Sequence, residues 1–136
     1  MILGIDPGAR RVGVAVGDET TRWAHALEVI DIATVDPVER ILELARQRGA
    51  SAIVVGRPLG LSGRAGPAVV SQRSFVDALR AGAGIPVEEF DERLTTVVAE
   101  KRLRSAGASA TTRKRVRDAV AAQVMLQDYL DAKGPP

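Results

Sequence analysis

The sequence predicts an α/β fold with a central mixed five-stranded sheet, its first three strands antiparallel, and helices on both faces. The first thirty residues hold three apolar segments separated by turn-forming residues, with too little chain between them for a helix. From residue 37 onward, segments of helical periodicity alternate with short apolar runs, which is typical of parallel strands. The 136 residues predict one domain, 1–136, whose last residues, about 132–136, are expected to fray.

The expected elements follow from local signals along the chain. A helix is expected to begin at Pro37, because Asp36 is a favoured N-cap residue and Pro is favoured at the first helical position. This helix should run to about Gly49. Further helices are expected at about 67–82, 95–106 and 113–132, and strands at about 2–6, 11–17, within 23–30, 52–56 and 86–91, with a Gly- and Pro-rich loop at 57–66.

Composition excludes several classes of protein. The chain has no Cys, which excludes disulfides and thiolate metal sites and is compatible with the cytoplasm. It has no run of about 18 apolar residues, so we expect no membrane span. No basic and apolar leader precedes the first strand, so we expect no signal peptide. We therefore expect a cytoplasmic protein with no membrane partner.

Positive charge is concentrated in one part of the chain. The segment from Arg93 to Arg117 holds eight Lys and Arg residues against one acid, Glu100, so it carries a net charge of +7 and leaves −5 for the rest. Such a local excess suits a polyanion such as nucleic acid. A solvated, Arg-rich helical face explains the charge equally well.

The first candidate functional residue is Asp6, which ends the first predicted strand and precedes Pro7 and Gly8. The end of a buried strand holds a carboxylate rigidly, and Gly lets a phosphate or a metal come close to the backbone. Asp-Pro-Gly is also an ordinary β-turn sequence, which leaves a structural interpretation open for this residue taken alone.

Two further acids, Glu92 and Asp118, have contexts that suit the same site. Glu92 ends a later strand, although an acid there can also favour the start of the next helix through the helix dipole. Asp91 and Glu92 point to opposite sides of a strand, so at most one of them can enter a shared site. Asp118 shares a helical face with Ala121 and other apolar residues, where an acid is costly unless it is paired or metal-bound. A salt bridge to the flanking Arg115 or Arg117, or an ordinary acid in the first turn of the helix, is the alternative for Asp118.

Three carboxylates in a chain without Cys favour a hard divalent cation, Mg²⁺ or Mn²⁺. One or two such ions, about 4 Å apart, can activate water and stabilise a leaving oxygen in phosphodiester hydrolysis. This chemistry requires no side-chain nucleophile. His25, the only His, is expected to be structural, and Ser62 can contact a phosphate but lacks the partners of a nucleophilic serine.

Four segments together resemble the YqgF/RuvX family, nearly end to end and in order. They are Asp6-Pro7-Gly8 with Arg11-Val12-Gly13-Val14-Ala15; Val55-Gly56-Arg57-Pro58-Leu59 with Gly63; Asp91-Glu92-Arg93-Leu94-Thr95-Thr96; and Asp118 with Ala121, Ala122, Leu126, Gln127, Tyr129 and Leu130. The resemblance implies an RNase H-like fold related to the Holliday-junction resolvase RuvC. Members are described as candidate pre-16S rRNA nucleases that act in late 5′ maturation of small-subunit rRNA in bacteria, and some are discussed as Holliday-junction resolvases.

Carried over to this chain, the resemblance places the catalytic, metal-binding acids at Asp6, Glu92 and Asp118, with Mg²⁺ or Mn²⁺ as the cofactor. It implies that Arg93 neighbours the site and that the loop 57–66 faces the substrate.

The chain departs from the family pattern at two positions. Ala9 stands where many members have a hydroxyl residue, which weakens any catalytic role for this side chain. Arg117 stands where an apolar residue is common, and it adds positive charge beside the site.

The residues expected to contact nucleic acid are Arg10, Arg11, Arg57, Arg64, Arg93, Lys101, Arg104, Arg113, Lys114, Arg115 and Arg117.

Several functions are compatible with these features. The favoured one is a metal-dependent endonuclease acting on pre-16S rRNA or a pre-ribosomal particle, with resolution of branched DNA as an alternative substrate. A non-enzymatic ribosome- or nucleic-acid-binding factor is a further alternative. Sugar-kinase and actin-type ATPases share the strand-turn-strand opening but need two lobes, and 136 residues supply one. The sequence is compatible with a monomer or a homodimer, since symmetric junction cleavage calls for a two-fold dimer and rRNA trimming does not.

Overall fold

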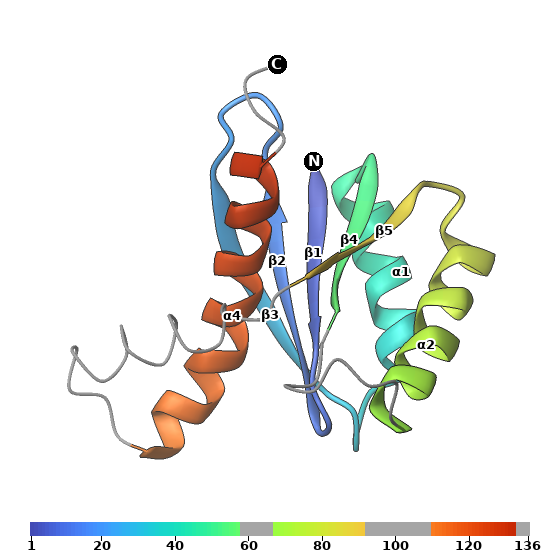
Figure 1. Ribbon diagram of the computed structural model, residues 1–136, viewed down its shortest axis with the longest axis vertical. Helices are drawn as coiled ribbons and strands as arrows, with labels where there is room; N and C mark the ends of the chain where they lie inside the picture. The colour runs from blue at the N-terminus through green and yellow to red at the C-terminus, as the bar shows by residue number, and fades with distance from the viewer. Residues whose placement is uncertain (58–66, 92–109, 133–136) are drawn as a thin grey trace.

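The computed structural model describes residues 1–57, 67–91 and 110–132, with the backbone alone described at 57, 67–71, 91 and 110–119. Five strands form one sheet in the order β3 (Ala24–Asp31), β2 (Arg11–Gly17), β1 (Ile2–Pro7), β4 (Ala52–Arg57) and β5 (Val87–Asp91). One face is covered by α1 (Pro37–Arg48) and α2 (Pro67–Ala83), and the other by α4 (Ala110–Ala132) (Figure 1). The predicted mixed sheet with helices on both faces is confirmed.

The strands pair as their order along the chain predicts. β1 pairs with β2 and β2 pairs with β3, both antiparallel, which forms the predicted meander. β1 pairs with β4 and β4 pairs with β5, both parallel. The last residues of β1, β4 and β5 therefore lie at one end of the sheet, which we call its carboxyl end.

The signals that predict α1 act as expected. The side chain of Asp36 accepts hydrogen bonds from the backbone amides of Val38 and Glu39, and Gly49 ends the helix at a φ of 62°. In the described part of the chain, no helix combines the length and hydropathy needed to cross a lipid bilayer.

Two elements begin at other residues than predicted. β5 begins at Val87 because Pro86 has no amide hydrogen to donate to a strand ladder. α4 begins at Ala110, three residues before its predicted start. The helix predicted at 95–106 lies outside the described residues.

Alternation along the strands produces two apolar cores, one on each face of the sheet. On β1, Leu3 and Ile5 point toward α1 and α2, whereas Ile2 and Gly4 face α4. The core under α1 and α2 is built from Val, Ile, Leu and Ala, as the low aromatic content predicts.

α4 approaches the sheet most closely at Gly4. A Cβ atom on Gly4 would lie 2.8 Å from the Cβ of Leu126, and one on Gly17 would lie 3.0 Å from the terminal carbons of Leu126 and Leu130. The helix backbone fixes the Cβ of Leu126, whereas terminal leucine carbons can rotate away. Gly4 therefore sets the height of α4 above β1.

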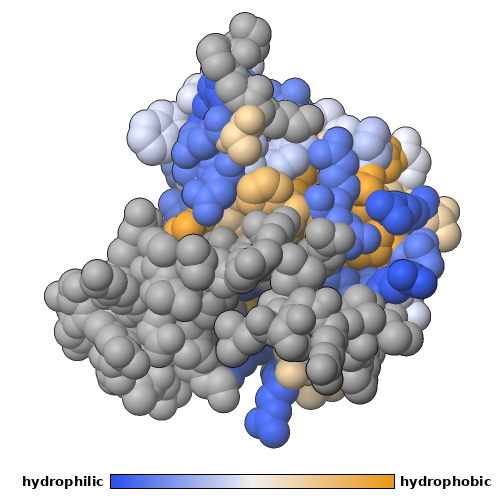
Figure 2. Space-filling model, viewed as in Figure 1, coloured by the Kyte–Doolittle hydropathy of each residue, from blue (hydrophilic) through white to orange (hydrophobic). Residues whose placement is uncertain are grey.

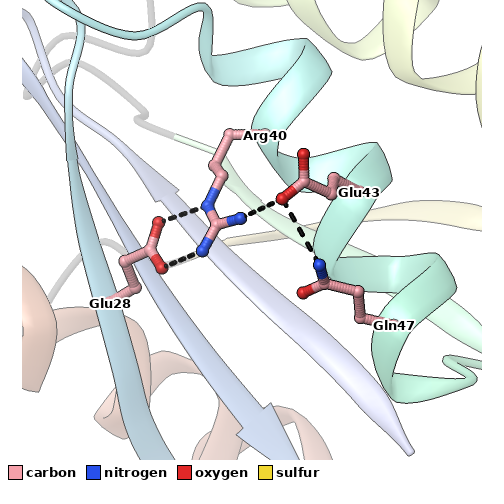
Figure 3. A network of polar contacts seen from close by, with 4 residues as sticks. All are labelled: Glu28, Arg40, Glu43 and Gln47. Atoms are coloured by element: carbon pink, nitrogen blue, oxygen red, sulfur yellow. Dashed lines mark hydrogen bonds and ion pairs between the residues drawn. The ribbon is translucent and has the colours of Figure 1, made fainter.

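An ion pair joins the edge strand β3 to α1. Arg40 donates to the two carboxylate oxygens of Glu28 at 2.8 and 2.7 Å, and it also pairs with Glu43, which accepts from Gln47 (Figure 3). The side chains of Arg40 and Glu28 are 29% and 30% exposed, so water screens this pair only in part. Hydrogen bonds from Arg40 hold the pKa of Glu28 below its usual value.

We expect Gly4→Ala to destabilise the fold, because the new methyl group overlaps an atom of Leu126 that cannot rotate away. Overpacking of this kind costs about 1–3 kcal/mol, which corresponds to several degrees of melting temperature in a domain of this size. Thermal unfolding followed by circular dichroism measures the loss. Gly17→Ala is the matched control and should cost less. Equal losses in the two variants would show that the height of α4 is not set at Gly4.

We expect Glu28→Gln to lower the free energy of unfolding at pH 7 by about 0.5–1 kcal/mol, the range for partly exposed ion pairs. Because the folded-state pKa of Glu28 is lowered, its contribution is present above the unfolded-state pKa and lost as the pH falls through the folded-state value. Denaturant unfolding between neutral pH and about pH 3 should show the wild type and the variant converging at acid pH. A constant difference across this range would contradict the role of the ionised carboxylate. Glu43→Gln is the control, because it removes the other acid that pairs with Arg40 but leaves the two hydrogen bonds to Glu28 in place. It should cause a smaller loss than Glu28→Gln.

Candidate active site

Asp6 lies near the carboxyl end of the central strand β1, opposite Gly13 of β2. Its side chain is half-buried. Because side chains alternate along a strand, Asp6 shares a face with Ile2 and Gly4, and this is the face that α4 covers. The structure therefore presents this carboxylate from the interior of a rigid sheet and beneath a helix.

α4 runs antiparallel to β1 across this face. Leu126 packs on Gly4, and Leu130 packs nearer the start of β1. Four helical residues advance about 6 Å and two strand residues advance about 6.6 Å. Four residues before Leu126 on α4 is Ala122, and two residues after Gly4 on β1 is Asp6. These equal advances predict that Ala122 lies over Asp6, and Ala122 is fully buried, as a close crossing requires.

The other two candidate acids are placed only by the backbone or not at all. Asp118 lies in α4 one turn before Ala122, so its backbone is carried toward the carboxyl end of the sheet on the same face as Asp6. The side chain of Asp118 and the whole of Glu92 lie outside the described residues. Within the described ranges, no three His, Asp or Glu side chains are grouped to hold a metal. The three-acid site therefore stays a prediction.

β5 also ends at the carboxyl end of the sheet. Gly56 of β4 lies opposite Phe90 of β5, and β5 ends at the next residue, Asp91, which directly precedes Glu92 in the sequence. The ring of Phe90 meets Tyr129 edge-on, with the ring centroids 5.7 Å apart, so this contact joins β5 to the last turns of α4 and not to the turn that carries Asp118. The end of β5 therefore lies at the carboxyl end of the sheet by strand register, beside the end of β1 and on the side toward which the first half of α4 is directed.

Arg10 lies in the turn between β1 and β2, and Arg11 is the first residue of β2, both close to Asp6 in the chain. The amide of Gly8 donates to the carbonyl of Arg11 at 2.9 Å and closes this turn. Arg10 is exposed and Arg11 is half-buried, on the α4 face by alternation with Ala15. The other side chains expected to contact nucleic acid lie outside the described residues: Arg57, Arg64, Arg93, Lys101, Arg104, Arg113, Lys114, Arg115 and Arg117.

His25 lies on the edge strand β3, opposite Val16, and is exposed. β2 separates its strand from β1 and Asp6. His25 is therefore not next to Asp6 in the sheet, and its structural role stays a prediction. Ser62 lies outside the described residues.

Gln72 is a residue whose position the sequence analysis did not single out. It is the one buried polar side chain among those the structure describes, and its Nε2 donates to the carbonyl of Gly56 at 2.8 Å. This hydrogen bond ties the carboxyl end of β4 to α2. The available signal was a Gln on the helical face that carries Val76 and Leu79, both buried.

The sequence matches a family model and several known proteins along nearly its whole length. A model of the RuvX family, described as Holliday junction resolvase, matches residues 1–132. A protein of Chloroflexus aggregans named "Putative pre-16S rRNA nuclease" is 45% identical over 136 residues, which cover 99% of this chain and 96% of that protein. A protein of the same name from Anaeromyxobacter sp. (strain K) is 42% identical over 134 residues, covering 98% of each.

Solved structures show the same fold. The chain aligns with T. thermophilus RuvC in complex with a Holliday junction substrate at a TM-score of 0.57 and 19% identity, covering 97% of this chain and 94% of that one. It aligns with the Fowlpox virus resolvase in complex with Holliday junction DNA at 0.58 and 10% identity, covering 98% and 99%. These likenesses show an RNase H-like fold. Together with the full-length family match, they establish that the chain belongs to the RuvX (YqgF) family.

Proposed function

We propose that this protein is a metal-dependent endonuclease that cleaves pre-16S rRNA during maturation of its 5′ end. Family membership makes it a nuclease, a hydrolase of ester bonds in nucleic acid. The proposal takes residues 1–136 as one catalytic domain that acts in the cytoplasm, where such a precursor is processed.

The convergence of β1, β5 and α4 at the carboxyl end of the sheet is the observation that carries the proposal. Asp6 lies there on the α4 face, Asp118 lies one turn before Ala122 on the crossing helix, and Glu92 follows β5 in the sequence. Carboxylates carried by strands and helices are held more precisely than carboxylates on loops. We assign these three acids as the catalytic residues.

The donor set fits a divalent cation. Carboxylate oxygens suit Mg²⁺ or Mn²⁺. Gly4, on the same face of β1, and Gly13, opposite Asp6 on β2, carry no side chains, which leaves room beside the carboxylate. Asp6, Glu92 and Asp118 would hold the ion. When bound, the ion would supply activation of the attacking water and charge stabilisation of the leaving oxygen.

The protein's own residues would position the substrate. Arg10 is exposed in the turn beside Asp6, where its guanidinium can bind a phosphate of the strand being cut. The basic segment from Arg93 to Arg117 would hold the backbone farther from the cleaved bond, with an affinity that falls with salt. α4 and the sheet exclude water from the buried side of Asp6.

Resolution of branched DNA is the second candidate, because the family description names that activity. The relatives at 42–45% identity are named for rRNA, whereas the resolvase structures share at most 19% identity with the chain, which favours the rRNA substrate. A junction resolvase would also need a two-fold dimer to cut two strands symmetrically.

We expect Asp6→Asn to lower the cleavage rate by at least about a hundredfold, because metal-ion catalysis contributes several kcal/mol to transition-state stabilisation. Cleavage of a 5′-extended small-subunit rRNA precursor and of a four-way DNA junction should be measured side by side with Mg²⁺, Mn²⁺ or EDTA. Asp77→Asn, an exposed acid on α2, is the matched control and should leave the rate unchanged.

The outcomes of this assay separate the candidate functions. Metal-dependent cutting of the RNA alone, lost in Asp6→Asn, supports the proposal. Paired cuts in the junction with intact RNA would replace it with a resolvase. Binding without cleavage of either substrate would replace it with a non-enzymatic factor.

We expect Arg10→Gln to weaken binding to the RNA precursor and to reduce the slope of log affinity against log salt by about 0.7–0.9, the value for one lost phosphate contact. Arg48→Gln is the control, because Arg48 is exposed at the end of α1, where the chain turns into the amino end of β4. Filter binding over a range of salt concentrations measures both slopes. Identical slopes for wild type and Arg10→Gln would remove Arg10 from the substrate surface.

A further inference from the structure

Trp23 is the most exposed large apolar side chain in the described part of the chain, at 64%, and it is the only Trp of the sequence. It lies between β2 and β3, in the blue loop beside the red end of α4 in Figure 1. This is the end of the sheet where β1 begins, opposite the end that carries Asp6. An exposed Trp is a frequent anchor of protein interfaces, because its large surface costs little conformational entropy on binding.

Hydrogen bonds tie the loop that carries Trp23 to α4 through the backbone of the residues directly before and after it. Gln127 accepts from the amide of Ala24 at 2.9 Å and donates to the carbonyl of Arg22 at 2.8 Å. Gln123 donates to the carbonyl of Ala24 at 3.1 Å. The backbone around Trp23 is therefore fixed by side chains of a buried helix, although the indole itself is mostly in water.

The residue before Trp23 has a strained backbone. Arg22 adopts a φ of 64°, the single positive value outside Gly among the described residues. Such a conformation is uncommon for a long side chain and persists where surrounding contacts enforce it. Here the Arg22 amide donates to the carbonyl of Asp18 at 2.7 Å, and its guanidinium donates to the carbonyl of Leu130. These contacts keep Trp23 in its exposed position.

Acidic groups surround Trp23. Asp18 donates its amide to the Trp23 carbonyl at 3.1 Å, and its carboxylate is kept ionised by backbone amides that lower its pKa. Glu19 is next in the chain. Asp131 accepts at 3.1 Å from the same Gln127 nitrogen that binds the carbonyl before Trp23.

The cations nearby are already engaged. The N-terminal ammonium of Met1 lies 3.8 Å from Glu19, and the Arg22 guanidinium binds a carbonyl in the last turn of α4, at the negative end of the helix dipole. Asp128 adds a further exposed acid on α4. The side of the molecule shown in Figure 2 exposes hydrophilic residues around a smaller apolar area. In the described part of the chain near Trp23, the ion pair with Met1 neutralises Glu19, and Asp18, Asp128 and Asp131 outnumber Arg22, so the surroundings are negative overall.

We propose that Trp23, with Asp18 and Asp131, forms a docking surface for a Lys- or Arg-rich segment of a partner protein. A cation over the face of an indole is attracted by the ring quadrupole, and the two carboxylates add ion pairs around it. A nucleic acid is disfavoured here, because its phosphates would meet the same carboxylates with like charge. The surface is separate from the carboxyl end of the sheet, so this inference does not depend on the nuclease function.

The single Trp makes the test direct. The full-length protein is titrated with an oligolysine peptide of about ten residues, with an oligoglutamate of the same length, and with an oligouridylate of similar length, and the indole fluorescence is followed. We expect the oligolysine to shift or quench the emission and the other two probes to leave it unchanged. The response should be lost at about 0.5 M NaCl, where ion pairs are screened.

Variants then locate the binding site. With fluorescein-labelled oligolysine and anisotropy detection, Trp23→Ala should weaken binding about fivefold, in the range of a cation–π contact. Trp23→Tyr should retain most of the affinity, and Asp131→Asn should weaken it. Ile32→Ala is the matched control. The Ile32 side chain is 39% exposed, and its backbone amide donates to the carbonyl of Arg10, which places it at the opposite end of the sheet from Trp23.

Three results would overturn the proposal. One is an unchanged emission with oligolysine, in protein whose indole is still quenched by acrylamide. Another is a larger response to oligouridylate, which would make the surface a nucleic-acid contact. The third is equal oligolysine affinity in Trp23→Ala and Ile32→Ala.

Discussion

The close contact between α4 and the bare backbone of β1 is the constraint on which the rest of this structure depends. Gly4 has no side chain, so Leu126 packs at a distance where a Cβ atom would lie 2.8 Å away. That contact sets the height of the helix above β1, and the packing of Leu126 and Leu130 on Gly17 adds a second point that sets its direction. The first half of α4, with Asp118, is thereby directed toward the carboxyl end of the sheet, while its last turns pass over the start of β1. Glycines at two positions of the sheet therefore position the helix that connects the two ends of the molecule.

The sequence was sufficient to predict the elements and their layers, because each is encoded by local signals. Asp36 and Pro37 mark a helix start, and the apolar run before Arg57 marks a buried parallel strand. The contact between Gly4 and Leu126 could not be predicted in the same way, since the two residues are far apart in the chain and neither is unusual alone. Gln72 shows the same limit: its polarity is visible in the sequence, but its partner Gly56 is visible only in the fold.

The candidate site also combines local patterns with contacts that only the fold shows. Asp6 could be predicted as a candidate site residue because a carboxylate at the end of an apolar strand is a local pattern. The structure places Asp6 on the face covered by α4. The family resemblance was needed to join Asp6 to Glu92 and Asp118, because spacing alone allows a cap or a salt bridge at each. Trp23 carried no sequence signal at all, since a Trp at the start of a strand is more often buried than exposed.

The two ends of α4 differ in charge. Its first turns carry Arg113, Lys114, Arg115 and Arg117, whereas its last turns carry Asp128 and Asp131 and no base. A polyanion is attracted to the first end of the helix and repelled from the second, so α4 would favour one orientation of the molecule on the proposed rRNA substrate. In that orientation Trp23, beside the last turns of α4, would lie away from the proposed site at Asp6, so a basic partner and the RNA need not compete for the same surface.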